Sequence, residues 1–355
     1  MSKVAGLLLS AVVALLCTAA TAAPNMPGEP VPAKFQIGGK DGSPLDHLPP
    51  NMRVISAFGE RPVISPNGKK IAFIGQTLGD AFEYDIATGE TRNLTSHMPH
   101  KGWMRIHYLK DGSYILAGPR NPGATPLETR MSDIELFWMD AGAKRPAVPL
   151  NQFVFEGIAS SREANRIAWA ALSPRKGPVT NLFTDRSTAL NVGDIVVVNG
   201  VGKLVNIRTI KAPPSIGCLF EAQDFLPGDV GVTVPCYGPK STKVLSIALA
   251  DGQITTYPTP PDLYGEIEGM FPDGKRSLVE CGNDSKSGND LCLLELTPNN
   301  PRYTRLTHAL DYGIYKFADP TVSPDGRLIA FQAGFGDDAP GVGRGLLLME
   351  LPAGF

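Results

Sequence analysis

The chain has 355 residues, with 33 Lys and Arg against 35 Asp and Glu, and it contains 38 glycines and 32 prolines. Because the charge is near neutral and the basic residues are dispersed, the sequence lacks the electrostatic footprint of a nucleic-acid-binding protein, and we expect no nucleic-acid partner. The many Gly and Pro residues are typical of a protein built from many short strands and turns.

The N-terminus predicts a secretory signal peptide over residues 1–22. Lys3 precedes an apolar run that ends at Cys17, and small residues follow up to Ala22, where an A-x-A site favours cleavage. The run is shorter than the roughly 20 residues of a membrane span, and every later apolar stretch is interrupted, so we expect no transmembrane segment. A lipoprotein anchored at Cys17 is the less favoured alternative, because the bulky Leu16 precedes that cysteine.

Four cysteines remain once the signal peptide is removed: Cys218, Cys236, Cys281 and Cys292. An even number in an exported chain predicts two disulfides, and four cysteines allow three pairings. The first two flank the turn Pro227-Gly228 and the last two flank the polar loop at residues 282–290, so each pair could face across one hairpin. We therefore expect Cys218–Cys236 and Cys281–Cys292; free buried thiols are the alternative.

Three stretches repeat one pattern, in which a Pro-Asx-Gly turn joins two apolar runs: residues 63–73, 270–279 and 322–331. Proline fixes its own φ, the Asx side chain caps the turn and glycine adopts the positive φ, so each copy predicts a hairpin. With weaker copies between them, the six turn positions are Gly68, Gly112, Asn165, Gly228, Gly274 and Gly326. They recur roughly every 45 to 60 residues, which is the blade spacing of a β-propeller.

Each turn is followed by another apolar strand and then by a shorter, more polar one, which gives four strands per unit. Six such units predict an all-β fold, a six-bladed β-propeller of four-stranded antiparallel blades. The final repeat stops after its third strand, at residues 346–351. We expect residues 53–58 to supply the missing outer strand and so to close the ring in the last blade.

The run Ser-Pro-Asp-Gly-Arg at residues 323–327 and the Arg-x-Leu-Thr at residues 92–95 resemble the WD40-like repeat of the TolB-type propeller family. The resemblance covers residues 52–355, and it specifies the fold but not the function, because the same repeat occurs in envelope proteins, prolyl peptidases and polysaccharide lyases. TolB itself has a globular domain before its propeller, whereas residues 23–51 are expected to form a Pro- and Gly-rich arm or linker. The resemblance implies a periplasmic location, with general secretion as the alternative.

We predict no catalytic residue. The sequence has no G-x-S-x-G elbow, which excludes a propeller peptidase, and no P-loop or H-E-x-x-H motif. The sharpest alternative comes from His97 and His308, which follow Leu-Thr at equivalent places in two blades. The resemblance to propeller lyases implies that histidines on this face can hold a divalent metal, although these two would have to reach across the central channel. Exposed loop histidines are the ordinary alternative.

A long acidic loop at residues 334–340 contains Asp337 and Asp338. Paired carboxylates could hold Ca²⁺, which prefers oxygen ligands, so the possible cofactor is calcium or another divalent metal bound by these residues or by the histidines. A solvated turn is the alternative for this loop, and the favoured expectation is that no cofactor is bound.

The remaining candidate binding residues are His100, Trp103 and Arg105. Trp103, with basic neighbours, is the best candidate for an exposed ring on which a sugar could stack. Trp138 and Trp169 fall within predicted strands, so we expect them in the core.

Two classes of function remain. The first is an exported, non-catalytic scaffold that docks another envelope or secreted protein through its loop face and channel mouth, as the resemblance to TolB implies. The second is a carbohydrate-directed protein, either a metal-dependent polysaccharide lyase or a glycan binder. The first is favoured, because the sequence lacks a dense set of convergent His, Arg, Tyr and carboxylate residues.

Overall fold

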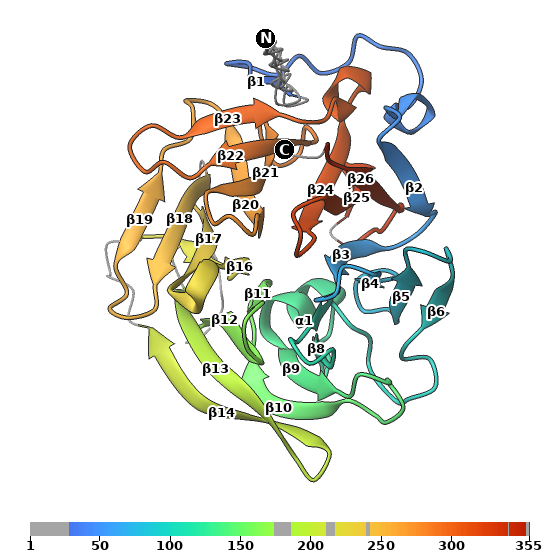
Figure 1. Cartoon of the computed structure of the whole chain (residues 1–355), viewed down its shortest axis with the longest axis vertical. Coiled ribbons are helices and arrows are strands. Elements are labelled where there is room, and N and C mark those ends of the chain that lie inside the picture. Colours follow the sequence, from blue (N-terminus) through green and yellow to red (C-terminus); the bar gives the residue numbers. More distant parts are fainter. Residues whose placement is uncertain (1–27, 174–185, 211–216, 239–241, 340, 353–354) are drawn as a thin grey trace, which may run out of the picture.

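The computed structural model describes residues 28–173, 186–210, 217–238, 242–339, 341–352 and 355. The predicted signal peptide and Pro340 of the acidic loop lie outside them. Six antiparallel sheets form a ring of blades (Figure 1), which confirms the all-β, six-bladed propeller with four strands of each blade in antiparallel order. Within the described residues, no helix is both long and apolar enough to cross a membrane.

The first three blades follow one another along the chain, and in blades one and two the innermost strand comes first. Blade one contains β3 (Glu60–Ile64), β4 (Lys70–Ile74), β5 (Ala81–Asp85) and β6 (Thr91–Asn93). Blade two contains β7 (Arg105–Tyr108), β8 (Tyr114–Pro119), β9 (Ile134–Met139) and β10 (Val148–Phe153), with the short helix α1 (Pro126–Ser132) between β8 and β9. Blade three contains β11 (Ile158–Ser160), β12 (Arg166–Leu172), β13 (Thr188–Val198) and β14 (Val201–Ile210).

The last three blades include strands from both ends of the described chain. In blade four, β15 (Leu219–Phe220) and β16 (Asp224–Phe225) both pair with β17 (Gly231–Tyr237), followed by β18 (Thr242–Ala248) and β19 (Ile254–Tyr257). Blade five contains β20 (Tyr264–Met270), β21 (Arg276–Gly282), β22 (Asp290–Glu295), β23 (Arg302–Arg305) and the added β1 (Glu29–Pro30). Blade six contains β24 (Tyr315–Val322), β25 (Leu328–Phe335), β26 (Leu346–Glu350) and β2 (Met52–Ser56). Short 3-10 helices are η1 (Pro44–His47), η3 (Pro227–Asp229) and η4 (Ala309–Tyr312).

The repeated turn joins the first two strands of a blade, and its glycines behave as predicted. Five of them have a positive φ, between 65° and 83°: Gly68, Gly112, Gly228, Gly274 and Gly326. Asn165 has no such φ, so the turn of blade three departs from the pattern. The serine of the motif has a role as well, since Ser65 Oγ accepts a hydrogen bond of 2.9 Å from the amide of Lys70.

The ring is closed by the N-terminal strand, as predicted. The strand β2 pairs antiparallel with β26, with Met52 opposite Met349 and Val54 opposite Leu347. Blade six is therefore assembled from the two ends of the propeller sequence, and its outer edge is covered without a partner chain.

Residues 28–51 run along blades five and six before they reach β2 (Figure 1). β1 pairs with β23 as a fifth strand of blade five. The ring of Phe35 is buried in the core of that blade, and its backbone exchanges two hydrogen bonds of 2.9 Å with the side chain of Asn283. Lys40 Nζ lies 2.9 Å from Asp311 Oδ2. These contacts fix the segment on the propeller surface.

Both predicted disulfides are present. Cys218–Cys236 joins the residue before β15 to β17, and Cys281–Cys292 joins β21 to β22, with Cα–Cα distances of 5.6 and 5.9 Å. Each therefore links strands of one blade, as the symmetric placement about a hairpin predicted. Two such bonds fit an oxidising compartment.

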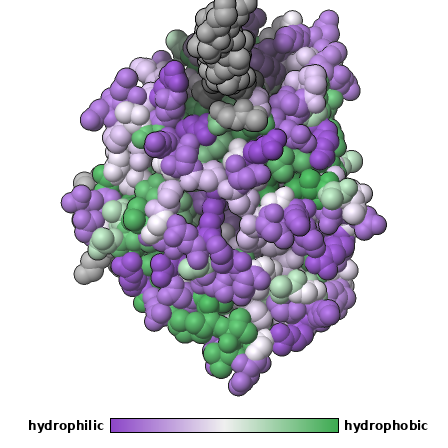
Figure 2. All heavy atoms as spheres, in the orientation of Figure 1, coloured by the Kyte–Doolittle hydropathy of each residue, from purple (hydrophilic) through white to green (hydrophobic). Residues whose placement is uncertain are grey.

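Apolar side chains fill the spaces between and within the blades, and Trp138 and Trp169 are both buried there, as expected. Figure 2 shows hydrophilic residues around the central hollow and a hydrophobic patch over the β13–β14 hairpin. Three consecutive valines of β13 are exposed: Val196, Val197 and Val198.

Candidate functional site

The inner part of each blade places one charged residue at the central channel. We call these six residues the belt: Arg61, Arg105, Glu156, Glu221, Glu268 and Asp319. They come from β3, β7, the β10–β11 connection, the β15–β16 connection, β20 and β24 in turn. All but Asp319 are buried. Because a buried charge without a partner is costly, the belt requires internal pairing.

The backbone is distorted where three of the belt residues occur. Arg61, Glu156 and Asp319 have φ values of 52°, 58° and 49°, which residues other than glycine rarely adopt. β3 and β24 also change register around Arg61 and Asp319. Such a bulge re-aims a side chain, in these two strands toward the channel. Each left-handed residue costs about 1–3 kcal/mol, so the surrounding packing must hold it in place.

Ion pairs connect the belt across the channel. Arg105 Nη1 donates to Asp319 Oδ1 at 3.1 Å and its Nη2 donates to Glu221 Oε2 at 3.2 Å, which joins blade two to blades six and four. Arg130 of α1 donates to both carboxylate oxygens of Glu156, at 2.7 and 3.0 Å. Bonds between different blades brace the centre of the ring.

The belt divides the channel into two cavities. The wide vestibule, with a volume of about 720 Å³, is lined by all belt residues except Glu268, by α1 and by the β21–β22 and β25–β26 loops. The narrow vestibule, with about 200 Å³, lies at the other end and is lined by residues of the turns that follow the inner strands. Arg61, Arg105 and Asp319 line both cavities.

Blades four and five present carboxyl and phenol groups to the channel. The phenol oxygen of Tyr237 hydrogen-bonds to both Glu221 and Glu266, and the phenol of Tyr264 donates to the other oxygen of Glu266. Glu280 on β21 lies beside them and accepts a hydrogen bond of 2.8 Å from the amide of Asp319. These three glutamates and Glu268 of β20 form what we call the carboxyl wall: Glu221, Glu266, Glu268 and Glu280.

Burial changes the protonation of the carboxyl wall. Burial, assisted by the charge of Glu266 and opposed by Arg105, raises the pKa of Glu221 to about 8. Burial also raises the pKa of Glu280 to about 7, although Lys316 Nζ lies 3.4 Å away. The pKa of Glu268 is raised well above its ordinary value by burial and by the neighbouring carboxylates. Burial therefore favours the protonated form of Glu221, Glu268 and Glu280.

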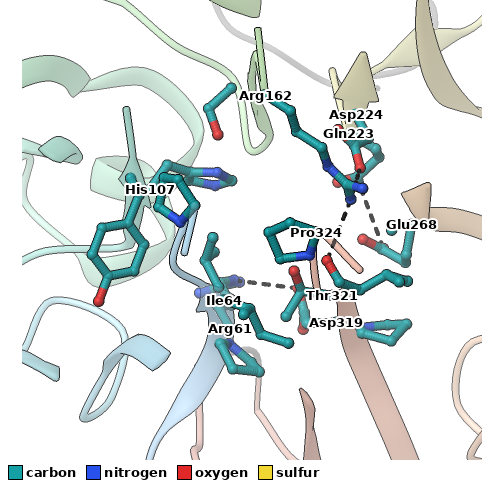
Figure 3. Close-up of a pocket in the computed structure, with 18 of the residues that line it drawn as sticks. Arg61, Ile64, His107, Arg162, Gln223, Asp224, Glu268, Asp319, Thr321 and Pro324 are labelled. Atoms are coloured by element: carbon teal, nitrogen blue, oxygen red, sulfur yellow. Dashed lines mark hydrogen bonds and ion pairs between the residues drawn. The ribbon is translucent and has the colours of Figure 1, made fainter. Parts of the chain in front are cut away.

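Arg162 crosses the narrow vestibule from the turn of blade three. Its Nη2 donates to the carbonyls of Met270 and Val322, on blades five and six, at 2.7 and 3.3 Å. The same atom lies 3.4 Å from Asp224 Oδ2 on blade four. Figure 3 shows this side chain extending into the middle of the cavity. One residue thus bridges four blades at this end of the channel.

The architecture was compared with solved structures. The TolB structure from Agrobacterium tumefaciens is similar to this chain with a TM-score of 0.50 and 12% identity, over 72% of this chain and 77% of that chain. The fold is that of a TolB-type six-bladed propeller. TolB from Acinetobacter baumannii is similar with a TM-score of 0.49 and 10% identity, over 80% of this chain and 64% of that chain. Oligogalacturonate lyase from Vibrio parahaemolyticus is similar with a TM-score of 0.48 and 12% identity, over 86% of this chain and 93% of that chain. No protein-family model and no curated protein matches the chain.

In this propeller, neither His97 nor His308 lines the wide or the narrow vestibule. His97 is exposed after β6, and His308 Nδ1 lies 3.7 Å from Asp311 beside η4. Among the described residues, one group of three or more His, Cys, Asp or Glu side chains could hold a metal ion, with ligand atoms within 4.8 Å of one another: Glu266, Glu268 and Glu280. The histidines and the acidic loop contribute nothing to that group.

The acidic loop borders the wide vestibule, but its two carboxylates make different contacts. Asp338 accepts hydrogen bonds of 2.6 and 2.7 Å from Arg344 and one of 2.8 Å from the amide of Phe335, so it holds its own loop together. Asp337 is exposed at the rim. The structure therefore does not use the two as a pair.

Trp103 is buried, with 3% of its surface exposed, and the expectation of an exposed sugar-stacking ring is wrong. A bridge between Trp103 and Gly79 turns the indole into the core between blades one and two, where it stacks on His100 with centroids 5.3 Å apart. His100 is held in turn by Asp80, 2.8 Å from its Nε2, and by the amide of Gly102, which donates to Nδ1 at 2.9 Å. Both residues stabilise a loop.

Arg105 is the one predicted binding residue that the structure places in the channel. His107, two residues further along β7, lines the narrow vestibule. Burial, together with the charge of Arg105, lowers the pKa of His107 to about 3, so this ring is neutral at physiological pH. No second histidine of the described chain lines either cavity.

The belt and the carboxyl wall were missed by the sequence analysis. The sequence nevertheless contains a signal for the belt. In each blade, the inner strand or the residues just before it include a charged residue in an otherwise apolar segment, shortly before the repeated turn. The helix α1 was missed as well, although Thr125 caps it by accepting a hydrogen bond of 3.1 Å from the amide of Glu128, and Pro126 follows the cap.

Proposed function

We propose that this protein is an exported, non-catalytic propeller that docks a segment of another envelope protein in the wide vestibule and on the loops around it. The observation that supports this best is the cavity itself, which has about 720 Å³ and is lined by eight carboxyl residues and five cationic ones on rigid strands and their loops. Charges of both signs in one concave surface select a complementary partner and its orientation. No small apolar pocket is needed for such binding.

Export rests on the signal peptide expected at residues 1–22 and on the two disulfides. The mature chain in this proposal is an arm at residues 23–51 followed by the propeller at residues 52–355, located in the periplasm. TolB and oligogalacturonate lyase share the fold, so the fold alone does not separate a scaffold from an enzyme. The proposal depends on the vestibule instead.

The test is crosslinked affinity capture of the tagged mature protein from its native envelope, with excess untagged protein as competitor. We expect a competable, near-stoichiometric protein partner. Charge reversal at the rim of the wide vestibule, Lys286→Glu or Asp337→Lys, should reduce capture about tenfold, since both side chains are exposed there. The matched control is Lys275→Glu, an exposed residue on the turn of blade five at the opposite face.

The competing function is a metal-dependent polysaccharide lyase, for which the glutamate group beside the vestibule is the supporting observation. A panel of uronate-containing polysaccharides, assayed for unsaturated products with and without a chelator, separates the two. Chelator-sensitive cleavage without a competable partner would refute the docking proposal.

A further inference from the structure

The narrow vestibule is lined by polar groups that the described chain leaves unpaired. Five of its side chains each have at least one oxygen or nitrogen atom that no hydrogen bond from a described residue reaches: His107, Ser160, Gln223, Glu268 and Thr321. They come from blades two, three, four, five and six in turn. Figure 3 shows His107 on one side of the cavity and Gln223 and Glu268 on the other. A ligand that pairs with such groups recovers the cost of leaving them unpaired.

Glu268 is the most buried of these groups, with 5% of its surface exposed. One of its carboxyl oxygens accepts a hydrogen bond of 3.3 Å from the side-chain amide of Gln223, and the other has no partner among the residues that the structure describes. Burial and the neighbouring carboxylates raise the pKa of Glu268 well above its ordinary value, which favours the protonated acid. The open oxygen can therefore carry a hydrogen and donate it to a ligand.

His107 supplies a second uncharged group across the cavity. Burial and the charge of Arg105 lower the pKa of His107 to about 3, so the ring is neutral at physiological pH. A neutral imidazole has one donor nitrogen and one acceptor nitrogen, and within the described ranges neither takes part in a hydrogen bond. Donors and acceptors without net charge therefore face the cavity from both sides.

The ionised side chains that line the interior of the narrow vestibule already have partners of opposite charge. The pairs are Arg61–Glu60 at 3.0 Å, Arg105–Asp319 at 3.1 Å and Arg162–Asp224 at 3.4 Å. A charged ligand would have to break one of these pairs and leave a buried charge uncompensated, which is costly. The remaining cation of the lining, Lys110, is exposed to solvent at the mouth. An uncharged ligand can bind without disturbing any pair.

Size and apolar surface narrow the class of ligand further. The cavity of about 200 Å³ has room for roughly seven water molecules at about 30 Å³ each, so it fits one small ring and not a segment of a protein. Apolar side chains line it beside the polar groups: Pro62, Ile64, Pro320, Val322 and Pro324. A hydroxyl group both donates and accepts, so a ring with several hydroxyls and with C–H faces matches both parts of the lining.

We propose that the narrow vestibule binds an uncharged monosaccharide, whose hydroxyls exchange hydrogen bonds with His107, Gln223 and Glu268 while its C–H face packs on the prolines. This site goes beyond the docking function and does not rest on it, because Glu268 and His107 do not line the wide vestibule.

The probes are three neutral sugars, D-glucose, D-galactose and D-mannose, each compared with its uronate, which replaces one neutral group by a carboxylate. Binding to the mature protein is measured at pH 7 by titration with NMR detection. We expect at least one neutral sugar to bind with a Kd of about 1 mM or tighter. Its uronate should bind at least about tenfold more weakly, because the cations of the site are already paired.

Two substitutions of one residue test the hydrogen bonds. Glu268→Gln keeps an uncharged donor and acceptor and should bind the preferred sugar within about threefold of the wild type, whereas Glu268→Ala should bind it about three- to tenfold more weakly. His107→Ala should weaken binding by a similar factor. Glu268 takes part in no ion pair of the described chain, so its variants should fold. The matched control is Glu90→Ala, at an exposed position on the outer part of blade one, which should keep the wild-type affinity.

Three results would overturn the proposal. They are the absence of a saturable shift with any of the three neutral sugars up to about 20 mM, which would mean that water alone fills the cavity; a uronate that binds as tightly as its neutral sugar; and wild-type affinity in Glu268→Ala. None of these measurements involves a partner protein, so failure here is distinguishable from failure of the capture experiment.

Discussion

Glu221 is a carboxylic acid at neutral pH in the folded protein, because burial raises its pKa to about 8. In the unfolded chain the same group ionises near pH 4.3, the ordinary value for glutamate. Between these two pH values the folded state binds more protons than the unfolded state. The free energy of unfolding therefore contains a contribution from Glu221 that decreases as pH rises from about 5 to 8.

The substitution Glu221→Gln should remove this contribution. One carboxyl changes the free energy of unfolding by at most about 1.4 kcal/mol per pH unit. The free energy of unfolding of the variant should therefore rise relative to that of the wild type, by up to this amount for each pH unit between 5 and 8. Urea unfolding at four pH values measures the difference. Glu90→Gln, which is exposed, should reproduce the wild-type slope. Identical slopes for the wild type and Glu221→Gln would mean that Glu221 is ionised in the folded state.

At the scale of elements, the attachment of residues 28–51 to the propeller depends on Phe35. The ring is 3% exposed, and Arg305 lies over it with its guanidinium carbon 5.1 Å from the centroid. We expect Phe35→Ala to lower the free energy of unfolding by about 3 kcal/mol, the lower end of the cost of a Phe-to-Ala cavity, since the segment can partly adjust. Urea unfolding measures this value.

Ile37→Ala provides the control for Phe35, because Ile37 is exposed on the same segment. Its effect should stay within about 0.5 kcal/mol of the wild type, as at most surface positions. Equal losses for Phe35→Ala and Ile37→Ala would mean that the segment is not docked through the buried ring.

The blades could be predicted from sequence because the residues that determine each hairpin lie close together in the chain. A Pro-Asx-Gly turn fixes a hairpin within a few residues, and each disulfide links strands of one blade. The channel could not be predicted in the same way. Arg105 and Asp319 lie 214 positions apart in sequence, and only the closed ring brings them within 3.1 Å. The expectations based on histidines and exposed loops therefore missed the charged residues that appear in single copies within apolar strands.

At the scale of the whole molecule, stability depends on closure by β2. A chain that starts at Gly59 lacks this strand, which leaves β26 with an unpaired edge and blade six open. We expect it to lose cooperative unfolding and to aggregate, as checked by circular dichroism and size-exclusion chromatography. A chain that starts at Asn51 retains β2 and should remain folded and monodisperse. Cooperative unfolding of both chains would mean that ring closure is dispensable.

The bridge made by Arg162 limits how a partner can enter the protein. Because this side chain connects blade three to the carbonyls of Met270 and Val322, a polypeptide could pass through this end of the channel only after those hydrogen bonds broke. We therefore expect a partner to enter and leave by the wide vestibule. A chain terminus or the tip of a tight loop would then be the part that reaches the belt, which restricts the topology of the partner before any side-chain chemistry is considered.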